Sequence, residues 1–359
     1  MDRKWKVILC GASFGQFYME ALHRLSEHFE VVGLYARESE RNVNCAKTYN
    51  IKLYTELLDI PEDVELAIVV MRSGILGGIG NDVVKHFLSN GIHVIQEFPI
   101  HPEDVEQHYK LARKNNVNYY IGDFYLKLPQ VIKFIKIAKL INVYTPILHI
   151  QMGMAVQLSF PAVMMLREIL DNKNIKLKCV TNNETMFQVL VGNAGETSLT
   201  FEVQSEMDLL DPDSSMCMFQ SVTLIYESGR LILDDPFGPI YWYPRVKTST
   251  SLYVDGKAGK TIPNPSGMQV ATQLGNYEAV DYVDIQGRLW IEAIQKDLMN
   301  MLSGIEDRKL YTKKAQKDIV GAKQWNEVNK IVGFPKKVER SHVTEDVWEK
   351  VKNIVKSMR

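Results

Sequence analysis

The sequence predicts a two-domain protein: an N-terminal α/β domain with a doubly wound parallel sheet, followed by an α+β domain. Apolar, strand-like runs alternate with amphipathic helical segments as far as residue 121, the order expected when helices cover both faces of a parallel sheet. The run Leu66–Met71 is apolar throughout, as in a strand buried on both faces. Beyond Gly122 the pattern changes to helices, alternating β-type segments and helices again. We therefore expect domains of residues 1–122 and 123–359.

Strands and helices of the first domain can be placed from the spacing of apolar residues. The expected strands include Val7–Cys10, Glu30–Ala36, Leu66–Met71, Ile92–Ile95 and Asn118–Ile121. Helices are expected at Phe17–Leu25, Asn81–Leu88 and Pro102–Lys114, with another that Ser39 caps. We expect six strands in this sheet.

The second domain begins with two predicted helices, Pro129–Ile141 and Phe160–Leu170. Short segments between residues 176 and 233 then alternate in the manner of antiparallel strands, at 189–191, 198–203 and 222–226. The glycine- and proline-containing segment 248–267 is expected to be a loop. Residues 280–302 have helical spacing, and a last helix with an apolar face is expected from Thr344 onward.

Composition excludes several classes of protein. Lysine and arginine (42) nearly balance aspartate and glutamate (43) in the 359 residues, so no bulk charge favours nucleic acid or anionic membranes. No window approaches the ~18 apolar residues of a membrane helix. The four cysteines form no Cys-x-x-Cys pair, which predicts neither a metal site nor a disulfide framework. With no signal-peptide pattern at the N-terminus, a cytoplasmic protein is expected.

The segment Gly11-Ala12-Ser13-Phe14-Gly15 lies between the first strand and the first helix, where dinucleotide-binding domains hold the pyrophosphate. Gly11 permits the tight turn, and Gly15 lets the backbone and the helix approach closely. Ser13 stands where a second glycine is usual, and a glycine turn without a ligand is the alternative. The position of the turn favours a cofactor.

The end of the second strand indicates which dinucleotide is used. An NAD site would carry an acidic residue here, whereas this chain has Arg37, Ser39 and Arg41. Arginines suit the 2′-phosphate of NADPH through charge-assisted hydrogen bonds. Solvated arginines at a helix start are the alternative, and Glu38 argues against NADPH. We expect NADPH.

Arg72 and Ser73 follow the central strand, at the carboxyl edge of the sheet where the cofactor crevice lies. They are expected to contact the phosphates or the ribose. For Arg72, an ion pair with a carboxylate of the second domain is an equally weighted alternative.

Glu97-Phe98-Pro99 at the end of the fifth run carries a family resemblance. The chain resembles the glucose-fructose oxidoreductase/inositol dehydrogenase/MocA group, which implies a Rossmann domain followed by an α+β domain on an open antiparallel sheet. Members usually carry Glu-Lys-Pro here, and their lysine acts as acid or base in sugar oxidation. Phe98 replaces that lysine and cannot exchange a proton, while Glu97 keeps its place at the cofactor.

Within that group the sequence is similar to the thiazolinyl imide reductases of siderophore assembly lines. The resemblance rests on Gly-Ala-Ser-Phe-Gly-Gln-Phe-Tyr at residues 11–18, on Arg37, on Arg72-Ser73, and on Gln-Glu-Phe-Pro-Ile-His at residues 96–101. It covers the first domain closely and the second loosely. It implies reduction by NADPH of a thiazoline C=N bond to a thiazolidine, on a substrate tethered to the carrier domain of a nonribosomal peptide synthetase. It also implies a homodimer.

Reduction of C=N requires a proton donor to the ring nitrogen, and two residues are candidates. His101 precedes Pro102, a good first residue of a helix, and the positive helix end favours its neutral form. Tyr125 lies where the chain leaves the last strand of the first domain. A capping histidine and a buried structural tyrosine are the alternatives.

Two other functions remain open at this point. Another oxidoreductase of the same group would act on a sugar, a cyclitol or an imine. A dinucleotide-sensing regulator would bind the cofactor and catalyse nothing, as the missing lysine allows. His101 and Tyr125 favour an enzyme, because they offer replacement proton donors.

Overall fold

The computed structural model describes residues 4–73, 77–181, 185–208, 215–246, 269–339 and 344–358. Its first domain is a six-stranded parallel sheet with the strand order β3-β2-β1-β4-β5-β6. The strands are β1 (Trp5–Cys10), β2 (Phe29–Tyr35), β3 (Lys52–Tyr54), β4 (Leu66–Val69), β5 (His93–Gln96) and β6 (Tyr119–Ile121). Its helices are α1 (Gly15–Arg24), α2 (Glu40–Thr48), η1 (Leu57–Asp59), α3 (Gly80–Ser89) and α4 (Pro102–Lys114). This confirms the doubly wound fold and the number of strands.

Strand β3 is the one strand of this sheet whose position the sequence analysis did not assign. It has only three residues, too few to show a periodic pattern, and it pairs with the end of β2 from Gly33 to Tyr35. Gly33 allows this pairing, because an added Cβ atom would lie 2.4 Å from the Tyr54 ring.

The second domain is built on an eight-stranded sheet with the order β15-β14-β13-β12-β7-β10-β9-β8. Its strands are β7 (Ile147–Ala155), β8 (Lys176–Cys179), β9 (Phe187–Ala194), β10 (Thr197–Gln204), β12 (Gln220–Tyr226), β13 (Gly229–Leu233), β14 (Ile240–Pro244) and β15 (Thr272–Gln273). The short strands β11 (Glu206–Met207) and β16 (Lys336–Lys337) pair separately. The helices are η3 (Phe124–Lys127), α5 (Pro129–Asn142), η4 (Val156–Leu158), α6 (Ser159–Ile169), α8 (Tyr282–Asp284), the π-helical turn η5 (Ile285–Leu289), α9 (Trp290–Glu306), α10 (Arg308–Val332) and α11 (Thr344–Ser357).

The large sheet is mostly antiparallel, which confirms the expected α+β domain, and it contains one parallel pair that the sequence did not reveal. β7 and β10 run parallel, with His149 opposite Ser198, while the other strand pairs described in this sheet are antiparallel. The reason is the connection: the chain passes through α6 and then through the antiparallel strands β8 and β9 before it returns as β10. Parallel neighbours require such a long crossover.

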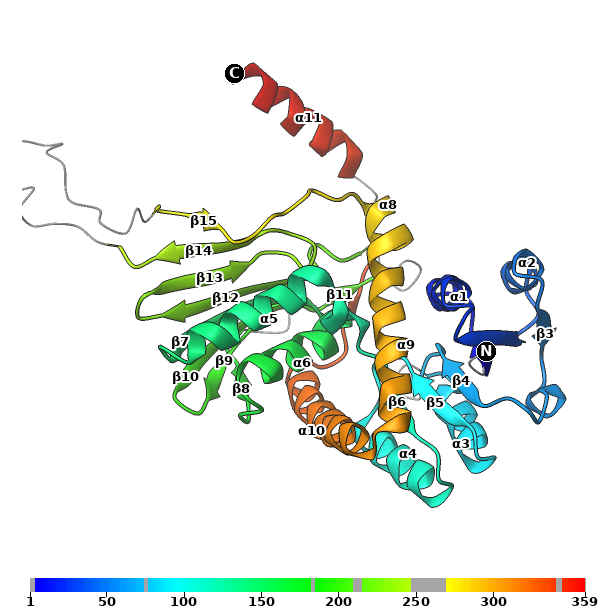
Figure 1. Ribbon diagram of the computed structural model, residues 1–359. Coiled ribbons are helices and arrows are strands. Elements are labelled where there is room, and N and C mark those ends of the chain that lie inside the picture. The colour runs from blue at the N-terminus through cyan, green and yellow to red at the C-terminus, as the bar shows by residue number, and fades with distance from the viewer. Residues whose placement is uncertain are drawn as a thin grey trace, which may run out of the picture.

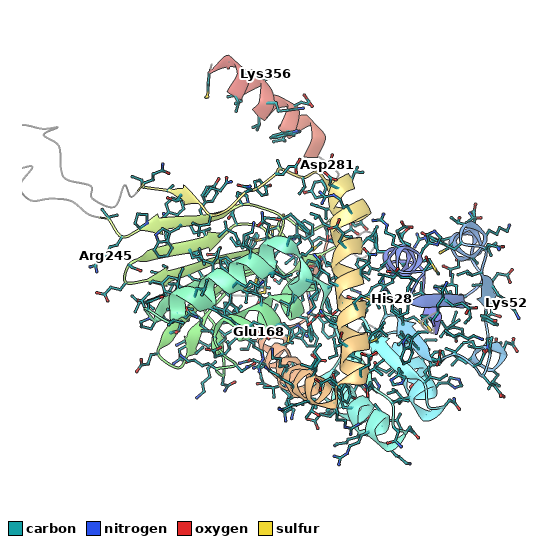
Figure 2. All side chains as sticks on the ribbon, viewed as in Figure 1. His28, Lys52, Glu168, Arg245, Asp281 and Lys356 are labelled. Carbon is teal, nitrogen blue, oxygen red and sulfur yellow. The ribbon has the colours of Figure 1, made fainter. Side chains whose placement is uncertain are left out.

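One face of this sheet is covered and the other is open. Helices α5 and α6 lie over the covered face (Figure 1). Buried and partly exposed side chains alternate along β12 and β13, as expected when a single face packs on a core. Glu168 on α6 ties these helices together, since it accepts a 2.8 Å hydrogen bond from Lys139 of α5 and another from Lys317 of α10 (Figure 2).

Helix α9 runs between the two sheets and joins the domains (Figure 1). Its Trp290 packs against Phe14 and Phe17 of the first domain, with ring centroids 5.5 and 5.1 Å apart. Phe124 at the start of the second domain contacts the same tryptophan. The glycine turn of the first domain is therefore held against the second domain by aromatic packing. The expected loop at 248–267 lies outside the described residues, and no helix in the described ranges is long and apolar enough to cross a membrane.

Candidate active site

In the turn between β1 and α1, only glycine fits at position 11. This residue has φ +90°, and a Cβ atom there would lie 2.5 Å from the carbonyl oxygen of Val70. Its N–H donates to the carbonyl of Tyr35 at 2.9 Å. The positive φ and the close approach both require glycine, as the sequence predicted.

The N-terminus of α1 is available to an anion. Its N-cap residue, Phe14, makes no capping hydrogen bond through its side chain. The close packing expected at Gly15 is not found, because an added Cβ atom would meet Leu9 and Val70 at an ordinary 3.6–3.7 Å. The uncapped end of α1 carries free N–H groups, and these groups together with the helix dipole favour a pyrophosphate. Ala12 is buried and Ser13 is exposed beside it.

The β2–α2 loop brings its arginines next to this turn. Ser39 caps α2 by accepting from the N–H of Asn42 at 3.4 Å, and the Asn42 side chain donates to the carbonyl of Arg37 at 2.7 Å. Arg41 then reaches the Ser13 hydroxyl at 3.3 Å. Arg37 and Arg41 are both exposed. A cationic, solvent-open loop beside the glycine turn has the chemistry to bind a phosphate on the adenosine ribose.

Arg72 and Ser73, which follow β4, differ in their exposure to solvent and in their contacts. The Ser73 hydroxyl is buried and donates to the carbonyl of Pro99 at 2.7 Å, so it holds the β5–α4 loop in place. Arg72 is exposed and forms no ion pair with any described carboxylate, so the expected alternative of a partner in the second domain is not seen. Contact of either side chain with a cofactor stays a prediction.

Glu97 follows β5 at the carboxyl edge of the sheet, where it is only partly exposed. The Tyr18 hydroxyl on α1 donates a hydrogen bond to its Oε2 atom. Burial raises the pKa of Glu97 to about 8, with a further contribution from the negative charge of Asp123. Near neutral pH this carboxyl is therefore mostly protonated, and it offers a hydrogen-bond donor at the carboxyl edge of the sheet.

Phe98 belongs to a group of aromatic side chains drawn from both domains. Its ring stacks on Phe160 of α6, with centroids 5.2 Å apart and planes 11° apart. Tyr125 meets Phe98 edge-on at 6.3 Å, and Trp325 of α10 meets Phe160 at 5.7 Å. We call Phe98, Tyr125, Phe160 and Trp325 the aromatic cluster. Tyr125, Phe160 and Trp325 are buried and Phe98 is partly exposed, so the Phe98 ring is the apolar surface that the cluster presents.

His101 is the N-cap of α4. Its Nδ1 atom accepts from the N–H of Glu103 at 3.4 Å, which places the proton of the neutral imidazole on Nε2. The capping role was the alternative considered for this residue, and it leaves Nε2–H available as a donor.

Tyr125 lies in η3 and is 6% exposed. It packs between Phe98 and Phe124, whose ring centroid is 4.6 Å away. The structure thus brings Tyr125 into contact with Phe98. Phe98 precedes His101 by three residues in the same β5–α4 loop.

A group of buried charges beside Glu97 was missed by the sequence analysis. Asp297 of α9 accepts from the N–H of Asp123 at 2.9 Å, and the ammonium groups of Lys127 and Lys314 lie 3.0 and 3.7 Å from the Asp123 carboxylate. Asp318 completes it, 2.6 Å from Lys314. We call these five residues the charge cluster.

The charge cluster has strongly perturbed ionisation. Burial and the nearby Asp123 raise the pKa of Asp297 well above its usual range, so Asp297 is neutral. Burial alone would raise the pKa of Asp123, but Lys314 and Lys127 hold it below its usual range. Only the i,i+4 spacings of Asp123 with Lys127 and of Lys314 with Asp318 were visible in the sequence, and such spacings occur on many exposed helices.

Two family profiles match the chain. Residues 5–123 match the GFO_IDH_MocA oxidoreductase family, NAD-binding Rossmann fold, and residues 147–243 match the C-terminal domain of the thiazolinyl imine reductase Irp3-like family. A search of the curated proteins gave no match.

Solved structures of similar fold are dehydrogenases and reductases. KijD10, a 3-ketoreductase from Actinomadura kijaniata in complex with NADP and TDP-benzene, has 10% identity and a TM-score of 0.67 over 94% of this chain and 100% of that one. A dehydrogenase from Chromobacterium violaceum has 12% identity and a TM-score of 0.66, with both chains fully covered. An inositol dehydrogenase homolog from Azotobacter vinelandii, complexed with NADH and myo-inositol, has 12% identity and a TM-score of 0.65 over 92% and 96% of the two chains. At these identities the likeness shows a shared fold.

Proposed function

Because the chain combines the N-terminal domain of the GFO/IDH/MocA oxidoreductase family with an Irp3-like C-terminal domain, we propose that it reduces a thiazoline C=N bond to a thiazolidine with NADPH. The observation that carries this proposal is the aromatic cluster. Phe98 stacks on Phe160 where sugar-oxidising relatives are expected to keep a lysine. The partly exposed ring of Phe98 suits contact with a flat heterocycle and offers a sugar hydroxyl no base.

The cofactor site is consistent with a dinucleotide. The Gly11 turn and the uncapped N-terminus of α1 would hold the pyrophosphate, and Arg37 and Arg41 with Ser39 would bind the 2′-phosphate. Bound NADPH would supply the hydride. The protonated Glu97 carboxyl would orient the cofactor from the strand end, together with Tyr18.

The protein's own chemical contribution is then one proton and the exclusion of water. Nε2–H of His101 and the hydroxyl of Tyr125 are the two donors for the ring nitrogen. Much of the rate comes from holding the electrophilic carbon close to the hydride, so neither donor need be essential. General-acid catalysis by one donor contributes about 10²–10⁴-fold.

The proposed substrate is tethered by phosphopantetheine to a carrier domain of a nonribosomal peptide synthetase, and the proposed site of action is the cytoplasm. We also propose a homodimer that pairs the open faces of the two large sheets. The test of the function is to mix the protein, NADPH and a thiazoline-bearing acyl thioester and to follow cofactor absorbance. Oxidation that depends on the thioester supports the proposal.

An alternative oxidoreductase acting on a sugar, cyclitol or other imine is kept open by the fold, which the inositol dehydrogenase homolog shares. The same assay with sugars and cyclitols tests it. Cofactor binding without oxidation in any of these mixtures would instead indicate a dinucleotide-sensing regulator.

A further inference from the structure

The Glu97 carboxyl lies where oxygen atoms from three elements converge. A Cβ atom added to Gly122, which follows β6, would lie 3.0 Å from the Tyr18 hydroxyl of α1 and 3.4 Å from Glu97 Oε2. The same atom would lie 3.7 Å from Oδ2 of Asp297 on α9. Because residue 122 has no side chain, these groups approach one another around it. Glu97 therefore has a hydroxyl and a second carboxyl as its polar neighbours.

In the part of the chain that the structure describes, no cation balances Glu97. The lysines of the charge cluster are engaged with its aspartates, at 3.0 Å for Lys127 and Asp123 and at 2.6 Å for Lys314 and Asp318. None of the ion pairs between described residues includes Glu97. Burial and the negative charge of Asp123 raise the pKa of Glu97 to about 8. The carboxyl therefore keeps its proton near neutral pH until a positive charge comes close.

The proposed cofactor would bring a positive charge to this edge of the sheet. Arg37 and Arg41, the proposed 2′-phosphate site, follow β2, and the Gly11 turn follows β1. A dinucleotide crosses the carboxyl ends of the strands, so in the order β3-β2-β1-β4-β5-β6 its other half extends toward β4 and β5. Glu97 directly follows β5, and its donor Tyr18 lies on the helix after the Gly11 turn. We therefore expect the nicotinamide ring, which is positive only when oxidised, beside Glu97.

We infer that the oxidised nicotinamide ring of NADP⁺ is the counter-ion that Glu97 lacks, so that this carboxyl releases its proton when NADP⁺ binds and keeps it when NADPH binds. The inference rests on the proposed cofactor and not on the thiazoline substrate. An opposite charge nearby favours the ionised form of a carboxyl, whereas the reduced ring is neutral and leaves it protonated. The proton passes to the solvent, and no other bond forms or breaks.

This linkage makes the choice between the two forms of the cofactor depend on pH. Below the pH at which free Glu97 ionises, NADP⁺ binding has to remove a proton, which weakens it by up to about tenfold for each pH unit. NADPH binding has no such cost. Near neutral pH the site therefore favours the reduced cofactor, which suits a reductase.

Calorimetric titration counts the released protons directly. NADP⁺ and NADPH are each titrated at pH 7.5 in two buffers with different ionisation enthalpies, and the difference in heat between the buffers gives the protons released. In the unaltered protein we expect NADP⁺ to release more protons than NADPH, by roughly half a proton or more for each nucleotide bound. Both nucleotides carry the same 2′-phosphate, so proton exchange at that group cancels in the comparison.

Two variants and a control assign the proton to Glu97. Glu97→Gln keeps the size of the side chain and cannot ionise, so the difference between the nucleotides should vanish. Tyr18→Phe removes a hydrogen bond that favours the ionised carboxyl, so free Glu97 should ionise at a higher pH and the difference at pH 8.5 should increase. Glu62→Gln, at an exposed position, should behave like the unaltered protein.

Equal proton counts for the two nucleotides in the unaltered protein, or a difference that persists in Glu97→Gln, would overturn the inference. If Glu97→Gln fails to fold, Tyr18→Phe decides, and an unchanged difference at pH 8.5 would count against Glu97. If neither nucleotide binds, the proposed cofactor and the inference fail together. If NADP⁺ releases the proton but no thioester is reduced, the inference stands and only the proposed substrate fails.

Discussion

The Tyr18 hydroxyl, on the first helix, donates a hydrogen bond to the Glu97 carboxyl at the end of β5. These residues are 79 positions apart. The bond joins α1 to the carboxyl edge of the sheet and holds the Glu97 side chain there. Because burial raises the pKa of Glu97 to about 8, this carboxyl titrates close to physiological pH.

Glu97→Gln should make the protein less sensitive to pH. In the unfolded chain this carboxyl titrates near its ordinary pKa of 4.5, whereas in the folded protein it titrates near 8, so the folded state binds more protons between these values. The free energy of unfolding therefore falls as pH rises through this window. Glutamine does not ionise, so the Glu97→Gln variant does not lose this stability. We expect Glu97→Gln to be about 4 kcal/mol more stable than the unaltered protein at pH 8.5 and similar at pH 5.

Urea unfolding at both pH values measures this difference. Glu62→Gln, at an exposed position, is the control and should show no such change. Parallel pH profiles for the Glu97→Gln and unaltered proteins would show that Glu97 is ionised at neutral pH.

Asp297 and Asp123 of the charge cluster should respond differently to replacement by asparagine. Asp297→Asn keeps an oxygen that can accept from the Asp123 N–H and removes a carboxyl that is already neutral, so we expect a change below about 1 kcal/mol. Asp123→Asn leaves Lys127 and Lys314 without their shared counter-ion and should cost about 3 kcal/mol. Thermal and urea unfolding of both variants give the comparison, and equal losses would refute the assigned ionisation states.

Gly11 and Gly15 should differ in their tolerance of an added methyl group. Gly11→Ala places a Cβ atom 2.5 Å from Val70 O at φ +90°, so we expect the free energy of unfolding to fall by more than about 1 kcal/mol. In Gly15→Ala the added Cβ atom meets the side chains of Leu9 and Val70 at ordinary distances, so this variant should fold normally. Urea unfolding of both variants measures the difference, and equal losses of stability would contradict the special role of Gly11.

Arg37→Ala and Arg41→Ala together should abolish a preference for NADPH. Charge-assisted hydrogen bonds contribute about 1.5–3 kcal/mol each. Compared with the unaltered protein, the double variant should therefore bind NADPH at least about tenfold more weakly, while its affinity for NADH should be almost unchanged. Arg113→Ala, exposed at the far end of α4, serves as the control. A loss of affinity for both dinucleotides, or for neither, would count against a 2′-phosphate contact.

Much of the first domain was predictable from local sequence because its elements have strong periodic signals. The apolar run Leu66–Met71, the glycine at position 11 and the proline-started helix Pro102–Lys114 each follow from residues close together in the chain. The missed features are non-local. The three-residue β3 is defined by pairing with β2, and the parallel partnership of β7 with β10 is set by the elements between them.

The same distinction applies to the site. Glu97, Phe98 and His101 could be selected as one short motif. The contact of Phe98 with Phe160 and the burial of Lys314 beside Asp123 depend on residues 62 or more positions away, which no local pattern reveals. The buried hydrogen bond from the Ser73 hydroxyl to the Pro99 carbonyl likewise joins two loops that are 26 residues apart, so no local pattern predicts it.

The most direct test of the proposed reduction is mass spectrometry of the product formed from a thiazoline acyl thioester and NADPH deuterated at the transferable position. The account predicts a thiazolidine carrying one deuterium on the former C=N carbon, formed with loss of NADPH absorbance. Its formation should slow about 10²-fold or more when His101→Ala and Tyr125→Phe are combined. Recovery of unlabelled thiazoline from a mixture in which the same protein transfers deuterium to a sugar or cyclitol ketone would contradict it.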